Sequence, residues 1–351
     1  MEGPIERINT IGIDLSKSFF QICAKNHVGR VIKQGKVGRG KVREVMGRFP
    51  AGTMVYMEAC QSAHYWCREF KKLGLEARQI APQFVKPYVK SQKNDRADAE
   101  AISEAGRCGT MKFVPTKGIG QQELQAIQRV RERLVHDRTA LMNQIRGILA
   151  EQGIVIRQGA FALKNCLAEI DKQELSVTLR ELIKNLQEEL TTLEERIKDC
   201  TRQLILRGKA CAAVRRLCTI PGVGSLTALG LAVVSGDPKE FKNGRQFAAF
   251  LGLVPRQAST GGKTKLLGIT KRGNVTVRTL LVHGARSVIR AAVLKKKQDP
   301  YSLWIQKLHA KHGTNHTAVA VANKNARVAW RILTSNEEFD AAKLAKAEHI
   351  Q

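Results

Sequence analysis

Four acidic side chains in this sequence are placed where they could bind a metal ion. Asp14 ends a short strand-like run, and Glu58 lies near the end of a later one. Asp95 and Asp98 are three residues apart in a helix-like run, so their carboxylates share one face of that helix. A carboxylate among apolar residues is costly to bury unless it is paired or coordinates a metal. We therefore expect an Mg²⁺ or Mn²⁺ site, where two such ions could orient and polarise a phosphodiester.

Each acid taken alone has another interpretation. Acids at strand ends are commonly solvated, and Asp95 is also suited to capping the N-terminus of a helix. The order of the four acids, in a chain that is poor in acids, favours the metal site.

Two adjacent hydroxyls, Ser259 and Thr260, precede a pair of glycines in a basic loop. A hydroxyl becomes a nucleophile when its proton is removed and the charge on the attacked phosphate is neutralised. Arg256 and Lys263 flank the two hydroxyls and could neutralise such a charge. The alternative, which spacing alone favours, is a surface turn without chemistry.

The chain carries 59 Lys and Arg against 31 Asp and Glu, a net charge of +28 over 351 residues. An excess of this size indicates a polyanionic partner, most simply nucleic acid. Residues 263–311 contain twelve Lys or Arg and a single acid, Asp299. The candidate phosphate contacts are Arg256, Lys263, Lys265, Lys271, Arg272, Arg278, Arg286 and Arg290.

The segment Ile220-Pro-Gly-Val-Gly224 joins two helix-like runs and is typical of a helix–hairpin–helix turn. The backbone amides around Gly222 and Gly224 could meet a phosphate at the start of the second helix. An ordinary tight turn between two helices is the alternative.

Membrane, secreted and zinc-binding classes are excluded by what the sequence lacks. It has no run of about 18 apolar residues, so no transmembrane helix is expected. The eight cysteines form no Cys-x-x-Cys pair, which predicts reduced, mostly buried thiols and neither a zinc site nor a disulfide framework. The first residues lack a secretory signal pattern, so we expect a cytoplasmic protein.

The elements that must position the four acids begin with an α/β domain, expected over 1–115. Strand-like runs are Ile8–Asp14, Phe19–Ala24, Val28–Val37, Thr53–Ala59 and Glu76–Ala81. Helix-like runs cover 40–49, His64–Leu73 and Asp95–Arg107. Three early strands followed by strand–helix alternation predict a sheet with helices on its faces. The four carboxylates could then converge at the C-terminal edge of one sheet.

A helical segment is expected over 116–210, followed by a mainly helical domain over 211–351. Apolar residues of the segment recur every three or four positions, at Leu179, Leu182, Ile183, Leu186, Leu190, Leu193 and Ile197. This stripe fits a coiled-coil seam between two chains, which its narrowness favours, or a helix packed within its own chain. In the last domain, Tyr301, Trp304 and Trp330 are expected to pack in the core, with stacking on bases as the alternative.

These motifs occur in a particular order. The N-terminal ones are Gly12-Ile-Asp14, the run Tyr56-Met-Glu-Ala-Cys-Gln-Ser-Ala-His-Tyr-Trp66, and Lys93-Asn-Asp-Arg-Ala-Asp98. The C-terminal ones are Ile220-Pro-Gly-Val-Gly224, Phe250-Leu-Gly-Leu-Val-Pro-Arg256, Gly261-Gly-Lys263, Ile269-Thr-Lys-Arg-Gly-Asn274 and Arg278-Thr-Leu-Leu-Val-His-Gly-Ala-Arg286. In this order they resemble the DEDD transposases of bacterial insertion sequences, the IS110 family with its IS1111 subgroup. The Piv DNA invertases belong to the same family.

The resemblance implies an RNase-H-like (RuvC-like) N-terminal domain whose four carboxylates bind Mg²⁺. It also implies a coiled coil for dimerisation and a C-terminal transposase domain, whose nucleophilic serine forms a covalent intermediate with DNA. Homodimers would assemble into a tetramer, in which the serine of one subunit meets the acidic cluster of another. A noncoding bridge RNA would pair with target and donor DNA in the bacterial cytoplasm.

The sequence departs from the family pattern at the nucleophile. In that pattern the nucleophile can directly precede the first glycine, a position that Thr260 occupies here. The extra methyl of threonine crowds attack on phosphorus, and a shift of one residue would bring in Ser259 instead. Either residue is therefore a candidate nucleophile, with Ser259 favoured, and an impaired copy is the alternative.

Together these observations predict an Mg²⁺-dependent DNA recombinase that moves its own insertion element. Two alternatives stay open. One is a RuvC-like DNA junction nuclease, in which metal-activated water attacks and the Ser-Thr loop is structural. The other is a non-catalytic nucleic-acid-binding protein.

Overall fold

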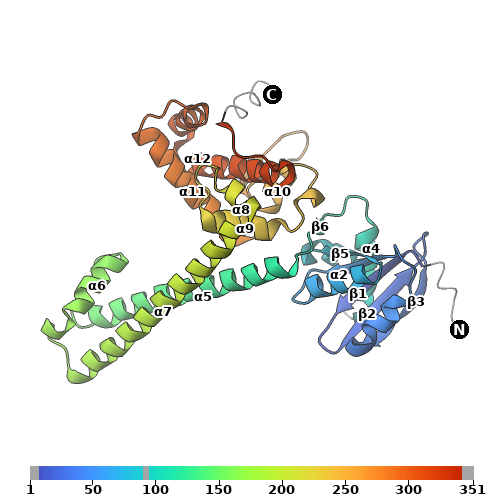
Figure 1. Cartoon of the computed structure of the whole chain (residues 1–351), viewed down its shortest axis with the longest axis horizontal. Coiled ribbons are helices and arrows are strands. Elements are labelled where there is room, and N and C mark those ends of the chain that lie inside the picture. Colours follow the sequence, from blue (N-terminus) through green and yellow to red (C-terminus); the bar gives the residue numbers. More distant parts are fainter. Residues whose placement is uncertain (1–7, 90–94, 342–351) are drawn as a thin grey trace. The chain divides into compact units, whose positions relative to one another are not determined.

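The computed structural model describes residues 8–89 and 95–341 of the chain and divides it into two compact units (Figure 1). The first unit extends to Ile119 and also takes in Ser235–Glu240. The second comprises Gly120–Val234 and the chain from Phe241 onward. The expected helical segment over 116–210 therefore shares a compact unit with the C-terminal helices, and its standing as a separate domain stays a prediction.

The first unit contains a mixed six-stranded sheet, which confirms the expected α/β class. Its strands are β1 (Thr10–Leu15), β2 (Phe19–Lys25), β3 (Val31–Gly38), β4 (Met54–Glu58), β5 (Glu76–Ile80) and β6 (Phe113–Val114), in the spatial order β3-β2-β1-β4-β5-β6. Strands β1, β4 and β5 run parallel; β2 pairs antiparallel with β1, and β3 pairs antiparallel with β2, so β3 has the same direction as β1. The helices are η2 (Arg39–Lys41), α1 (Val42–Gly47), α2 (Ala63–Lys72), α3 (Pro82–Val85), η3 (Lys86–Tyr88) and α4 (Asp95–Arg107).

The two faces of this sheet pack against different helices because successive side chains of a strand point to opposite faces. Ile13 of β1 and Met57 of β4 are fully buried in a cluster with Trp66 and Phe70 of α2. On the other face α4 lies so close to the backbone that Gly12 has no room for a side chain. A Cβ at Gly12 would overlap the carbonyl oxygen of Ala99 in α4.

An ion-pair cluster holds α4 to the end of β2. Lys25 is only 1% exposed, and its Nζ contacts Glu100 at 3.4 Å and also Glu104, both on α4. A buried ammonium without a partner is strongly unfavourable, so these carboxylates fix the position of the helix along the sheet. No motif in the sequence marks Lys25 as a buried residue.

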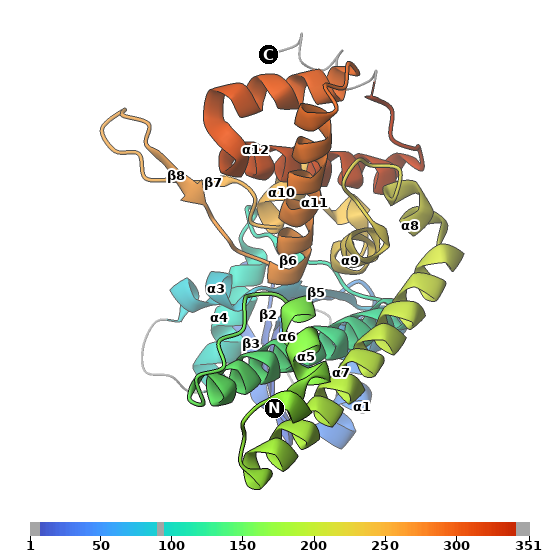
Figure 2. The same cartoon turned by 90° about the vertical axis from the view of Figure 1, so that its left-hand side faces the viewer.

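The second unit begins with a long antiparallel pair of helices, α5 (Ile119–Ala150) and α7 (Val177–Ala210), which lie side by side in Figures 1 and 2. Between them come α6 (Ala160–Ala168) and η4 (Ile170–Lys172). The predicted apolar stripe of α7 is buried within its own chain, where Ile183, Leu190 and Ile197 share a core with Leu134 and Ile145 of α5. For these residues the packing is the second of the two expected arrangements, and a coiled-coil seam between two chains stays a prediction.

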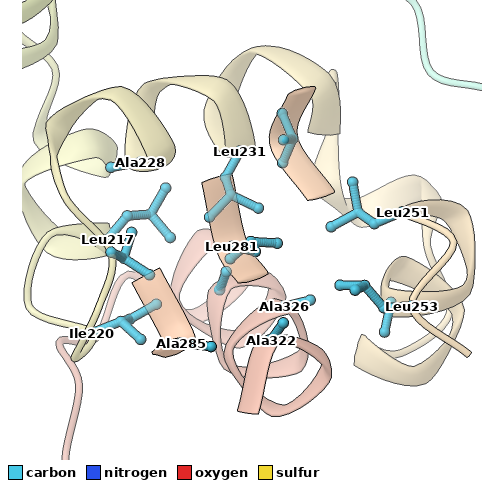
Figure 3. Packing of buried hydrophobic residues seen from close by; sticks show 14 of the residues in the cluster. Leu217, Ile220, Ala228, Leu231, Leu251, Leu253, Leu281, Ala285, Ala322 and Ala326 are labelled. Atoms are coloured by element: carbon cyan, nitrogen blue, oxygen red, sulfur yellow. The ribbon is translucent and has the colours of Figure 1, made fainter. Parts of the chain in front are cut away.

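The rest of the second unit is a helical bundle with one β-hairpin. Its elements are α8 (Ala212–Leu217), α9 (Ser225–Ser235), α10 (Gly244–Phe250), β7 (Pro255–Gln257), β8 (Leu266–Ile269), α11 (Val275–Leu294) and α12 (Pro300–Ser335). The short helix η5 (Pro238–Glu240) follows α9 in the chain and belongs to the first unit. Figure 3 shows Leu217, Leu281, Leu251 and Ala322 pointing into one common interior. The small side chains of α12 there allow it to pack closely against α11.

Two expectations from composition have different outcomes. Within the two described ranges, no helix combines the length and apolarity that a membrane crossing requires. All eight cysteines are free thiols, but only Cys23 and Cys67 are buried, so the expectation of mostly buried thiols is wrong. Burial raises the pKa of Cys23 to about 11, which keeps this thiol protonated at neutral pH.

We expect Gly12→Ala to lower the free energy of unfolding by about 1–3 kcal/mol, because the new methyl forces α4 away from the sheet. The matched control is Gly35→Ala on β3, where a Cβ meets nothing within 4 Å. Urea unfolding followed by circular dichroism measures both variants. Equal stability of the two variants would contradict the close packing of α4 on β1.

Candidate active site

Asp14 and Glu58 lie at the same level on neighbouring parallel strands. Ile13 of β1 pairs with Met57 of β4, so the residue that follows each of them is also adjacent across the sheet. Neighbouring strands are about 4.8 Å apart. Because side chains alternate, both acids belong to the face that packs against α4, and both are half-buried. The sequence prediction that strand order would bring these two acids together therefore agrees with the sheet register.

Helix α4 runs antiparallel to β1, and this direction determines where its acids lie. Arg107, at its C-terminal end, donates to the carbonyls of Asn26 and His27 just beyond β2, at 2.8 and 2.9 Å. Ala99, near its start, lies over Gly12. The first turn of α4, with the half-buried Asp98, is consequently at the end of the sheet that carries Asp14. The backbone of Asp95 begins this helix, while its side chain lies outside the described residues.

The carboxylate oxygens at this edge have the donor chemistry that Mg²⁺ and Mn²⁺ prefer. Among the side chains that the structure describes, however, no group of three or more His, Cys, Asp or Glu is close enough to hold a metal. This edge of the sheet therefore offers suitable ligands from two strands and one helix. The carboxylates that the structure describes do not by themselves form a complete metal-binding site. The metal site stays a prediction.

The two candidate nucleophiles lie near the tip of the β7–β8 hairpin, which extends away from the helices in Figure 2. Gly261 and Gly262 have φ values of +53° and +76°, the left-handed region in which residues with a Cβ are strained. Positive φ at both central positions is the type I′ turn that matches the twist of two-residue hairpins. The amide of Lys263 donates to the carbonyl of Thr260 at 3.0 Å and closes the turn.

The hairpin presents the two hydroxyls differently. Thr260 bridges to Lys263, and residues opposite each other across a hairpin share a face, so this hydroxyl is on the side of the Lys263 ammonium. Ser259 is on the other face. Its Oγ accepts hydrogen bonds from the Lys265 amide at 3.2 Å and from Gln257 Nε2 at 2.8 Å. Both residues are exposed, so either oxygen is accessible to DNA.

Most of the candidate phosphate contacts are solvent-exposed. These residues are Arg256, Lys263, Lys265, Lys271, Arg272, Arg286 and Arg290. Arg278 is the exception and requires a correction, because it is only 8% exposed and donates to the carbonyls of Leu251 and Arg272 at 3.1 and 2.8 Å. Its burial lowers the pKa of the guanidinium. Arg278 ties two loops together and is not a surface ligand for phosphate.

The turn Ile220–Gly224 joins α8 to α9, and packing explains its first glycine. Gly222 has a φ of +81°, and a Cβ there would lie 2.6 Å from Val288 and 2.7 Å from the carbonyl oxygen of Gly284 in α11. The carbonyl of Pro221 accepts a hydrogen bond from Asn325 of α12 at 2.9 Å. Gly224 is exposed. Close packing thus accounts for Gly222, and a phosphate contact at this turn stays a prediction.

Comparison with known proteins defines the class. A family model described as "Transposase" matches residues 11–153, and one described as "Transposase IS116/IS110/IS902 family" matches residues 214–301. A probable family 20 transposase of Pseudomonas aeruginosa is 44% identical over 331 residues, covering 93% of this chain and 97% of the relative. The transposase for insertion sequence element IS1111A of Coxiella burnetii is 43% identical over 335 residues, covering 95% and 91%.

A more distant relative is the pilin gene-inverting protein of Moraxella lacunata, 21% identical over 287 residues, 79% of this chain and 77% of that protein. The chain is thus a DNA transposase, an enzyme that acts on DNA. It belongs to the IS110 transposase family, and its similarity to the IS1111A transposase agrees with the expected subgroup. This membership removes the non-catalytic binder from the alternatives.

We expect Arg278→Met to lower the free energy of unfolding by about 1–3 kcal/mol, because it leaves two carbonyls unpaired. The salt dependence of DNA binding should not change. The control is Arg286→Met on the same helix, an exposed position where stability should change by less than about 0.5 kcal/mol. A different result would contradict this: Arg278→Met could keep full stability and reduce the slope of log DNA affinity against log salt concentration by about one. Arg278 would then be a phosphate ligand.

Proposed function

We propose that this transposase cuts and rejoins the DNA of its insertion element through a covalent Ser/Thr–DNA intermediate, with Mg²⁺ or Mn²⁺ held by Asp14, Glu58, Asp95 and Asp98. The observation that carries the metal assignment is the register of β1 and β4, which makes Asp14 and Glu58 neighbours. The first turn of α4 adds Asp98 at the same end of the sheet.

The topology supports a finer assignment of the first domain. The second and third strands each run antiparallel to the strand before them, and β4 and β5 run parallel to β1 in the order β3-β2-β1-β4-β5. This topology supports our proposal of an RNase-H-like (RuvC-like) domain, the fold that the family resemblance implies. In such a sheet, acids at the end of the first and fourth strands lie next to each other, as Asp14 and Glu58 do.

The reaction that we propose is attack by a hydroxyl oxygen on the scissile phosphorus. The hydroxyl of Ser259 or Thr260 gives its proton to solvent and its oxygen forms a bond to phosphorus, while the bond to the 3′ oxygen of the DNA breaks and that oxygen takes up a proton. Lys263 and Lys265 in the same hairpin neutralise the charge that develops on the phosphate. A divalent cation held by the four acids would polarise the phosphate and stabilise the leaving 3′ oxygen.

The acids and the hydroxyls belong to different compact units, which agrees with a site shared between subunits. We propose a homodimer that assembles into a tetramer, in which the hairpin of one subunit meets the acidic edge of another. A noncoding bridge RNA is the proposed guide, and the net charge of +28 supports binding of RNA as well as DNA. Both proposals follow from the family resemblance, as does the bacterial cytoplasm as the place of action.

For the metal assignment, we expect Asp14→Asn and Glu58→Gln to reduce Mg²⁺-dependent recombination by about 100-fold or more, because each removes a charged ligand. The control is Glu76→Gln, an exposed carboxylate at the start of β5. Recombination is measured on a plasmid substrate at several Mg²⁺ concentrations, and melting curves verify that the variants are folded. Unchanged recombination in Asp14→Asn would show that the metal assignment is wrong.

A second experiment identifies the nucleophile. Purified protein is incubated with Mg²⁺, the RNA from the end of the element and nicked target DNA, and the products are separated on a denaturing gel. We expect a covalent protein–DNA band that Ser259→Ala abolishes and Thr260→Ala retains, because the serine oxygen is less crowded. Loss of the band only in Thr260→Ala would make Thr260 the nucleophile. Hydrolytic cleavage without any band would replace this mechanism by that of the junction nuclease with metal-activated water.

A further inference from the structure

A large groove lies in the second unit beside the base of the hairpin that carries the two hydroxyls. Its volume is about 1400 Å³. Pro255 and Leu267–Ile269 of the hairpin form one wall, and the second half of α12 forms another. Val319, Ala320 and Val328 contribute apolar surface. The groove is thus continuous with the strands that lead to Ser259 and Thr260.

Cations and tryptophans line the same groove. The cations are Arg245, Lys271, Lys324, Arg327 and Arg331. Two of the three tryptophans of the chain, Trp304 and Trp330, also line it. The Nζ of Lys324 lies 4.0 Å from the centre of the Trp304 ring, a cation–π contact that holds the ammonium beside the aromatic surface.

An acidic segment of the chain lies along the groove. Glu337, Glu338 and Asp340 are among its lining residues. Phe339 anchors this segment, because its ring meets the Tyr301 ring edge-on at 5.8 Å and its amide donates to Thr219 Oγ1 at 3.0 Å. Carboxylates therefore lie beside the basic lining, in the place where an anionic ligand would be attracted.

We propose that this groove binds the unpaired DNA strand next to the scissile phosphate. The proposal rests on the proposed function, since strand exchange at the hairpin requires unpaired DNA there. Aromatic and apolar surface accommodates bases, and a rim of Lys and Arg accommodates phosphates. A duplex keeps its bases stacked inside, so it can use the contacts to phosphates but not the aromatic and apolar contacts to bases. The phosphates of the strand replace the carboxylates of Glu337 and Glu338 at the rim.

The test uses the full-length protein and a fluorescein-labelled oligothymidylate of twelve nucleotides, compared with a duplex of the same length. Arg327→Glu should weaken binding of the single strand by about tenfold. The matched control is Lys311→Glu, an exposed position on the same helix outside the groove, where the change should be less than about twofold. Arg327→Lys keeps the positive charge and should retain the affinity for the single strand. This variant shows whether the loss in Arg327→Glu comes from the change of charge or from misfolding.

Two further measurements report on the groove itself. Binding of the single strand should quench the fluorescence of Trp304 and Trp330, and Arg327→Glu should require more DNA for the same quenching. Glu337→Gln with Glu338→Gln should raise the affinity for the single strand, because competing carboxylates are removed.

Equal losses in Arg327→Glu and Lys311→Glu, or tighter binding of the duplex, would overturn the proposal. Tighter binding of an RNA strand of the same length would overturn the assignment to DNA. Covalent adduct formation is measured on the same variants: an adduct that is normal in Arg327→Glu overturns the groove proposal alone. Strand binding without any adduct in the wild-type protein overturns the covalent mechanism alone.

Discussion

The contact of helix α4 with the backbone of β1 is the constraint on which the candidate acidic site depends. Gly12 allows the helix to lie directly on the strand, and the buried Lys25 fixes it in register through Glu100 and Glu104. Only with α4 in this position does its first turn lie at the end of the sheet where Asp14 is found. A displaced helix would separate Asp98 from the strands even if every carboxylate were retained. Gly12 and Lys25, which are not candidate ligands themselves, therefore determine where the proposed metal ligands lie.

In the proposed mechanism, the second unit presents a hydroxyl to DNA on an exposed element. A type I′ turn with two glycines makes a narrow hairpin, and the buried Arg278 ties together the loops on either side of it, at Leu251 and Arg272. The groove at the hairpin base adds apolar surface and cations where the proposed substrate strand would leave the hydroxyls. The helical bundle is tightly packed, while the hairpin that carries the hydroxyls is exposed. A stable scaffold of this kind can hold a loop in a precise position.

Much of the fold follows from local sequence patterns, and the rest depends on contacts that are distant in sequence. The alternation around Ile13 and the apolar run before Glu58 predict strands, and the order of elements places both acids at strand ends. Periodicity in α7 identifies its buried face but not the partner of that face, and the partner is α5 of the same chain. Arg278 has the same residue type and neighbourhood as surface arginines, so its burial could not be predicted. The groove combines residues from 243 to 340, and no motif marks it.

In the proposed site, the acids of β1, β4 and α4 together hold one metal centre. The most direct measurement replaces Mg²⁺ with Fe²⁺ in the full-length protein and generates hydroxyl radicals with ascorbate and peroxide, which cut the backbone near the bound iron. We predict cuts clustered around residues 14, 58 and 95–98, suppressed by excess Mg²⁺ and absent in Asp14→Asn. Cuts elsewhere in the chain, or cuts at these positions that Mg²⁺ does not suppress, would contradict the claim.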